Sequence, residues 1–255
     1  MLNKLKEIIN GRNICILAHG KSINELADKI KDFKDLDICW ATLNSFPMME
    51  KYILNTIDKR ISVLFDCSTV PESRIVEYEK FRTYRISNYL MREDNNIWIT
   101  SYGLIRDLKP LGYEIFTNAW IHKTLQVDKL FPPYKIPYYM SVPNSVTLLI
   151  AACIAGGAKK IITFGLDGYN GDIEKGLDSC FHPEIVREER LLALGSKNDE
   201  GINRDTILFE KNFGRLYEEY KKLFNSNTEI FNCSPSSIYT CIKKITYDEA
   251  LKELI

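Results

Sequence analysis

The sequence predicts a doubly wound α/β fold with a mainly parallel sheet. Three observations lead to this prediction. Short apolar segments alternate with amphipathic segments along the chain, and each short apolar segment runs into a polar turn. The stretch 141–170 combines a helix, a glycine stop, a β-branched strand and a polar loop, which make up half of a parallel α/β unit.

Composition is that of a globular chain without a strong overall charge. Of its 255 residues, 45% are hydrophobic and 27% charged, and basic and acidic residues number 34 each. This length suits one domain, 1–255, and the balanced charge argues against nucleic acid as a partner. No apolar run reaches the roughly 18 residues that a membrane-spanning helix needs. Because the first residues form an amphipathic pattern rather than a signal peptide, we expect a cytoplasmic protein.

The cysteines and histidines do not suggest a metal site. The seven cysteines contain no Cys-x-x-Cys pair, and Cys15 and Cys153 lie inside apolar runs, which indicates reduced, buried thiols. The three histidines, His19, His122 and His182, lack metal-ligand spacing. We therefore expect no bound metal.

The apolar and β-branched runs are predicted strands, and the amphipathic or apolar runs between them are predicted helices. Glycine ends the first helix at Gly11 and the central helix at Gly156, and Pro71 begins another helix. The predicted strands are 13–18, 37–42, 60–65, 84–90, 96–100, 161–165 and 228–232. The predicted helices are 2–11, 23–32, 48–55, 71–80, 118–125, 144–156, 205–224, 238–242 and 247–254.

The turn after the first strand contains His19, Gly20 and Ser22 and leads into a helix. Backbone N–H groups at such a turn favour an anion, so a phosphate or nucleotide site is one interpretation. The other is a plain turn in which Ser22 caps the helix. The sequence is not a Walker motif, because the leading glycine of that motif is absent.

The turns after the next two strands are also polar. Asn44 and Ser45 follow the second strand, where they could bind a base or ribose or only form a turn. Asp66 follows the third strand. Because the carboxyl ends of parallel strands meet at one edge of a sheet, we expect these turns to gather there and to form the ligand site.

The central and late segments add further polar residues to the same edge. Asn144 and Ser145 begin the central helix, and Asp167 and Tyr169 follow the strand after it. The polar segment 170–203, which contains His182, is interpreted as a mobile lid. Ser236 lies in the turn after the last strand. The segment 247–255 could touch a membrane or a partner subunit, but we expect it to dock on the core.

Six of these turns, taken together and in chain order, resemble motifs of a known family. The matching segments are 18–23, 44–46, 65–69, 144–146, 165–169 and 233–237. The resemblance, which runs over nearly the whole chain, is to the bacterial lipooligosaccharide sialyltransferases and their relatives, the motility-accessory flagellin glycosylation factors and archaeal hydroxymethylpterin diphosphokinases. It departs from the family in two places: His19 replaces an asparagine, and the position of the family's catalytic histidine falls at Glu200 or Gly201.

The resemblance implies a Rossmann-like, metal-independent glycosyltransferase without a cofactor. Its donor would be a CMP-activated sugar, such as a sialic-acid-like nonulosonate, and its acceptor a surface glycan or glycolipid. A homo-oligomer and a peripheral membrane contact are compatible with the sequence. The implied nucleotide- and sugar-binding residues are His19, Gly20, Ser22, Asn44, Ser45, Asn144, Ser145 and Ser236. The implied catalytic residues are His182 as general base, Tyr169 as donor to the leaving phosphate, and Asp167.

Two of these roles, and the function itself, have alternatives. His182 could be a loop histidine that only packs or faces solvent, and Asp167 could be a turn former. Magnesium-dependent diphosphate transfer to a pterin would require Asp167 and Asp66, with or without Asp172, to converge on a metal. A non-catalytic nucleotide-sugar-binding protein is the third hypothesis.

Overall fold

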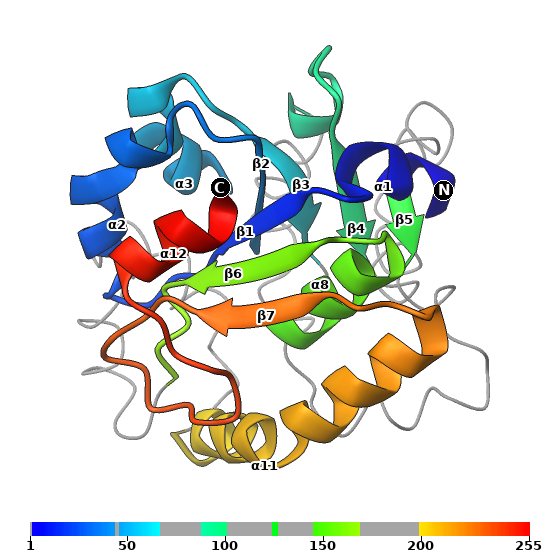
Figure 1. The fold of residues 1–255 in the computed structure, drawn as a ribbon, viewed down its shortest axis with the longest axis vertical. Helices are drawn as coiled ribbons and strands as arrows, with labels where there is room; N and C mark the ends of the chain where they lie inside the picture. The colour runs from blue at the N-terminus through cyan, green and yellow to red at the C-terminus, as the bar shows by residue number, and fades with distance from the viewer. Residues whose placement is uncertain (1, 44–45, 67–87, 101–123, 127–144, 169–198) are drawn as a thin grey trace, which may run out of the picture.

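The computed structural model describes residues 2–43, 46–66, 88–100, 124–126, 145–168 and 199–255. Within these residues, seven strands form one sheet in the order β5-β4-β3-β2-β1-β6-β7, and all neighbouring strands are parallel (Figure 1). The predicted doubly wound α/β fold is therefore confirmed. The strands are β1 Asn13–Leu17, β2 Ile38–Leu43, β3 Ile61–Phe65, β4 Ile97–Thr100, β5 Thr124–Gln126, β6 Lys160–Phe164 and β7 Glu229–Asn232.

Helices cover both faces of the sheet. On one face α1, α8 and α11 share a core with the strands, and on the other face α2, α3 and α12 do so. Strand β1 shows the alternation, because Ile14 and Ile16 belong to the first core and Cys15 and Leu17 to the second. The α-helices are α1 Leu2–Ile9, α2 Ile23–Lys29, α3 Phe46–Tyr52, α8 Ser145–Ala155, α11 Asp199–Phe224 and α12 Tyr247–Leu254, with 3-10 turns η1 Ile30–Phe33 and η2 Leu54–Ile57.

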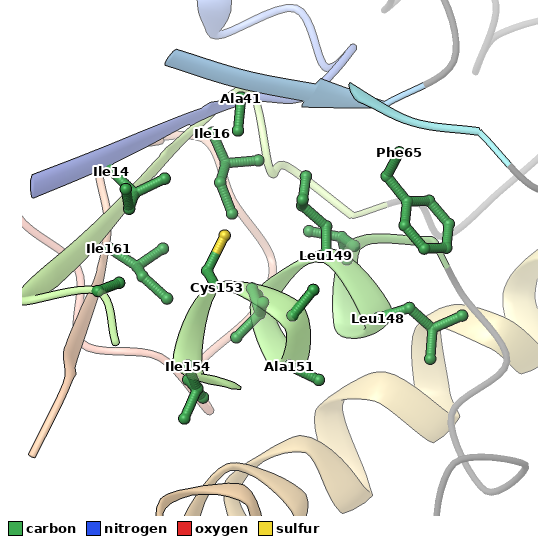
Figure 2. Close-up of a cluster of buried hydrophobic side chains, with 14 of the residues drawn as sticks. Ile14, Ile16, Ala41, Phe65, Leu148, Leu149, Ala151, Cys153, Ile154 and Ile161 are labelled. Carbon is green, nitrogen blue, oxygen red and sulfur yellow. The ribbon is translucent and has the colours of Figure 1, made fainter. Parts of the chain in front are cut away.

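Helix α8 lies between the sheet and α11. Its residues from Val146 to Ala155 are all buried, which explains why its sequence is apolar on every side. Figure 2 shows its side chains beside those of the sheet. The labelled members of this core are Ile14, Ile16, Ala41, Phe65, Leu148, Leu149, Ala151, Cys153, Ile154 and Ile161.

Two predictions in the middle of the chain are wrong where the structure describes them. Residues 88–90 form a helical turn rather than the end of a strand, and Tyr89 is buried with its hydroxyl donating to the carbonyl of Ile97 at 3.2 Å. Residues 124–126 form the edge strand β5 rather than the end of a helix. Pairing with β4 makes residues 124–126 a strand, and local propensity does not contain that information.

The predicted helix at 238–242 is also absent, and residues 199–203 of the predicted lid belong to α11. In residues 238–242, backbone N–H groups donate hydrogen bonds to a side chain of α11 instead of forming helical hydrogen bonds. Glu210 of α11 accepts the N–H groups of Thr240 at 2.9 Å and Cys241 at 3.3 Å, and also the Thr240 hydroxyl. Burial alone would raise the pKa of Glu210, but these hydrogen bonds outweigh it and lower the pKa.

The opposite, amino edge of the sheet carries an ionic cluster around Arg92. Its guanidinium contacts Glu50 at 2.6 Å, donates to the carbonyl of Ile61 at 3.2 Å, and pairs with Asp94. Burial alone would raise the pKa of Asp94, but the hydrogen bonds and charge of Arg92 outweigh it and lower the pKa. Because ligands of parallel sheets bind at the carboxyl edge, we interpret this cluster as structural.

No helix among the described residues has the length and apolar character needed to cross a bilayer. The C-terminal helix α12 docks on the core as expected, with Tyr247, Ala250 and Leu254 buried against the sheet.

Candidate functional site

The candidate site lies where the direction of the strand order reverses. From β1 the chain builds the sheet outward to β5, and it then returns to place β6 on the other side of β1 (Figure 1). At such a switch point the turns leaving the two central strands diverge, which is where open α/β sheets bind ligands. Here the two turns are residues 18–22 after β1 and 165–168 after β6.

Hydrogen bonds continue from the strands into these turns. The N–H of Ala18 donates to the carbonyl of Phe164 at 2.8 Å, and the N–H of Gly20 donates to the carbonyl of Gly165 at 2.8 Å. The two turns therefore run side by side for several residues beyond the ends of the strands.

Ser22 and Asp167 meet across this junction, although 145 positions separate them in the sequence. The backbone N–H of Ser22 donates to Oδ2 of Asp167 at 2.9 Å, and its hydroxyl donates to Oδ1. Ser22 is buried and Asp167 half-buried. The carboxylate lies at the amino end of α2, where the helix dipole favours a negative charge.

This geometry excludes one of the two interpretations of the turn, the one in which the side chain of Ser22 caps α2. Its backbone is already helical and its hydroxyl makes no capping bond, because the charged carboxylate of Asp167 takes that hydroxyl as a donor. Both donors of Ser22 are thus satisfied within the protein. An incoming phosphate would have to displace Asp167 to reach them.

Gly20 allows the two turns to approach each other. A Cβ atom at this position would lie 2.5 Å from Oδ2 of Asp167 and 2.5 Å from the carbonyl oxygen of Gly165, closer than real contacts allow. The sequence predicts Gly20 as a ligand-binding residue. In the structure its missing side chain makes room for Asp167, and this accounts for glycine at the position without any ligand.

A third turn, the residues after β7, holds the segment that carries Asp167. Ser234 accepts the N–H of Leu166 at 3.0 Å through its hydroxyl, and the N–H of Ile238 donates to the carbonyl of Asp167 at 2.7 Å. Asn232 donates its side-chain amide to the carbonyl of Leu166 at 3.1 Å. Three turns from distant parts of the chain therefore meet at Asp167.

Several of the residues that hold this segment were not predicted as site residues from the sequence. Ser234 and Ser237 are buried, whereas Ser236, the predicted binding residue of the same turn, is exposed and free of the junction just described. Asn232 is fully buried at the end of β7. The sequence feature that could have identified Asn232 is its place as a polar residue at the end of an otherwise apolar strand.

The C-terminal helix supports the junction from the second face of the sheet. The hydroxyl of Tyr247 donates to the carbonyl of Ser22 at 3.0 Å, and its ring stacks on Phe164 with 5.8 Å between centroids. Burial raises the pKa of Tyr247 far above its ordinary value, and neighbouring acidic groups raise it further. The phenol therefore stays protonated and remains a donor.

The other predicted site residues are only partly placed. His19 is half-buried in the turn after β1, and Ser145 is half-buried as the first residue of α8. Because α8 precedes β6 and runs antiparallel to it, its first residue lies at the carboxyl edge. The remaining predicted residues lie outside the described ranges: His182, Tyr169, Asn44, Ser45 and Asn144.

Among the described residues, no group of three or more histidine, cysteine, aspartate or glutamate side chains is placed to hold a metal ion. Asp66 is buried at the end of β3, which is three places from β6 in the sheet. At the usual spacing of strands, the ends of β3 and β6 lie about 14 Å apart. A single metal ion bound directly by both carboxylates would have to bridge that separation, which argues against a shared metal.

The described cysteines are free thiols, and Cys15 and Cys153 are buried as predicted. Burial raises the pKa of Cys39 and Cys233 to about 12. Thiols with so high a pKa are poor nucleophiles near neutral pH, so we assign them to packing rather than chemistry.

A comparison with known protein families finds no match, and no curated protein matches the sequence.

Proposed function

We propose that this chain is a glycosyltransferase that moves a sugar from a CMP-activated donor to a hydroxyl group of a surface glycan or glycolipid. The observation that supports the proposal is the junction of Ser22 and Asp167 at the switch point between β1 and β6. This is the place where doubly wound sheets bind nucleotides. Three of the six segments that resemble the sialyltransferases, 18–23, 165–169 and 233–237, include the turns that form it.

Asp167 would contact the donor through a hydroxyl group. A carboxylate has about four acceptor positions, and Ser22 uses two of them. Since Asp167 is half-buried rather than enclosed, its remaining positions can accept hydrogen bonds from a ribose or sugar. A phosphate, in contrast, would be repelled by this charge, and we therefore place the donor's phosphate away from Ser22.

The transfer itself requires a base and a donor to the leaving group. The acceptor hydroxyl loses its proton as its oxygen attacks the anomeric carbon, and the bond from that carbon to the CMP phosphate breaks. His182 is the proposed base, because an imidazole titrates near neutral pH. Tyr169, two residues after Asp167, is the proposed hydrogen-bond donor to the departing phosphate.

The geometry favours glycosyl transfer over magnesium-dependent diphosphate transfer. That reaction needs carboxylates gathered around magnesium and phosphate. Asp66 and Asp167 follow strands that lie three places apart in the sheet, as described above. Glycosyl transfer of the proposed type makes no such demand on them.

A thermal-shift screen with CMP, CDP, UDP, GDP and ATP, each with and without magnesium, tests the proposal. We expect CMP to raise the melting temperature without magnesium, since a ligand stabilises the state that binds it. Stabilisation by ATP only with magnesium would instead favour the diphosphokinase. A second assay measures the release of CMP from CMP-activated sugars with a panel of acceptors. If CMP binds but no CMP is released, the result would favour a non-catalytic binding protein.

The role of His182 is tested by replacement. His182→Ala should abolish turnover of the CMP-activated sugar that the wild type uses and leave the melting-temperature shift with CMP in place. Full turnover by the variant would remove His182 from the mechanism. His122→Ala is the matched control, because it removes another histidine to which we assign no role.

A further inference from the structure

One residue beside the junction is too deeply buried to touch a ligand. Asn232 is fully buried at the end of β7, and both ends of its side chain are bonded within the protein. Its Oδ1 accepts the hydroxyl of Thr163 at 3.0 Å, and its Nδ2 donates to the hydroxyl of Ser237 at 3.0 Å and to the carbonyl of Leu166 at 3.1 Å. A buried amide with these partners is a structural connection between segments.

The backbone of Asn232 is fixed as firmly as its side chain. Its N–H donates to the carbonyl of Lys243 at 2.9 Å, and its carbonyl accepts the N–H of Ile245 at 3.1 Å. Asn232 therefore has a defined position from which its side chain can hold the neighbouring turn.

That neighbouring turn has little conformational preference of its own. Gly165 and Gly168 flank Leu166 and Asp167, and both glycines have positive φ, at 70° and 73°. Glycine loses more conformational freedom on ordering than other residues, so outside contacts must order this segment. The N–H of Leu166 is held by Ser234 and its carbonyl by Asn232, on either side of the same residue.

The fixed backbone of Leu166 restricts the conformation of the next residue, Asp167. Once both polar backbone groups of Leu166 are fixed, and the carbonyl of Asp167 accepts the N–H of Ile238 at 2.7 Å, the backbone direction at Asp167 is set. Its carboxylate then reaches the two donors of Ser22 across the switch point.

We propose that Asn232 is a positioning residue of the site: together with Ser234 it holds Leu166 so that the carboxylate of Asp167 faces Ser22 and the ligand. The effect on ligand binding rests on the proposed function. The effect on the contact between Asp167 and Ser22 does not, and the test measures the two separately.

The test compares Asn232→Ala and Ser234→Ala with Asn96→Ala. Asn96 is also a fully buried asparagine, and its Nδ2 donates to the carbonyl of Tyr89 at 2.9 Å. It lies at the amino edge of the sheet, just before β4, so it controls for loss of a buried amide far from the site. Ser234→Ala removes only the hydroxyl that accepts the N–H of Leu166. If Asn232→Ala does not fold, the comparison of Ser234→Ala with Asn96→Ala decides the test.

The first readout is the backbone amide resonance of Ser22 in a ¹H–¹⁵N spectrum of the full chain. The second is the affinity for CMP, measured by calorimetry. In Asn232→Ala and Ser234→Ala we expect the Ser22 resonance to move and CMP to bind about tenfold more weakly, by analogy with the loss of hydrogen-bond partners of metal-binding residues. In Asn96→Ala we expect neither change, even where the melting temperature falls equally.

The possible results separate this proposal from the proposed function. An unmoved Ser22 resonance in the folded site variants, or an equal movement in Asn96→Ala, would overturn the positioning role. Moved resonances with no CMP binding by the wild type would support the positioning role and refute the proposed donor. Moved resonances with unchanged CMP affinity would refute the part that concerns the ligand.

Discussion

Replacing Asp167 with alanine tests the central contact of the site. The substitution removes the acceptor of two hydrogen bonds and leaves the N–H and hydroxyl of Ser22 without their partner. Because Ser22 is only 4% exposed, water cannot easily replace the carboxylate. The side chain also sits at the amino end of α2, so a favourable charge is lost as well.

The expected cost follows from these contacts. A hydrogen bond to a charged group contributes about 1.5–3 kcal/mol, and the partial exposure of Asp167 reduces this. We therefore expect Asp167→Ala to lower the free energy of unfolding by about 2–3 kcal/mol. Ser22→Ala removes only the hydroxyl bond and should cost about 1–2 kcal/mol. Since both variants break the same contact, the double variant should be less destabilised than their sum, by about 1 kcal/mol.

Urea denaturation of the four proteins of this cycle, followed by far-UV circular dichroism, measures these differences. Asp28→Ala is the matched control, because Asp28 is an exposed aspartate on α2 and its loss should change stability by less than about 0.5 kcal/mol. Strict additivity of Ser22→Ala and Asp167→Ala, or a stability of Asp167→Ala equal to that of the control, would refute the reasoning.

Further predictions concern packing and acid stability. Gly20→Ala should lower the free energy of unfolding by about 1–3 kcal/mol, because the added Cβ would overlap Asp167 and the backbone of Gly165. Gly214→Ala on α11 is the control: its Cβ meets open space, and alanine favours the helix, so this variant should be stabilised. Thermal unfolding compares the two variants, and equal melting temperatures would contradict the predicted overlap at Gly20. The pKa values of Glu210 and Asp94 are lowered in the folded state, so their stabilisation is present above the unfolded pKa of about 4 and is lost as pH falls through the folded value. Urea midpoints should therefore fall below about pH 4. The stability difference between wild type and Glu210→Gln should narrow over the same range as the carboxylate becomes protonated, and a gap that stays constant to low pH would argue against an ionised acceptor at Glu210.

The strands that the sequence predicts correctly share one property. Residues 13–18 and 161–165 are short apolar runs, and they are found as β1 and β6 at the centre of the sheet, buried on both faces. For such strands local composition and final environment agree. The edge strand β5 was missed because only its pairing with β4 makes residues 124–126 a strand.

Asp167 illustrates how much of the site can be predicted from the sequence. Its position after a buried strand predicted that it would lie at the carboxyl edge of the sheet, and it does. Its partner could not be predicted in the same way. The sequence left two interpretations of Ser22, a cap of its own helix or part of a phosphate site, and in the structure its hydroxyl bonds Asp167 instead.

The amino-acid sequence by itself determined the alternation of strands and helices and placed polar residues in the turns between them, because both follow from the local order of apolar and polar side chains. Only the tertiary structure decided which turns are neighbours, and so which donor faces which acceptor. The hydrogen bonds of Asn232 to Leu166 and of Ser22 to Asp167 form between segments that are far apart along the chain. Their formation depends on the order of strands in the sheet, about which local patterns contain no information.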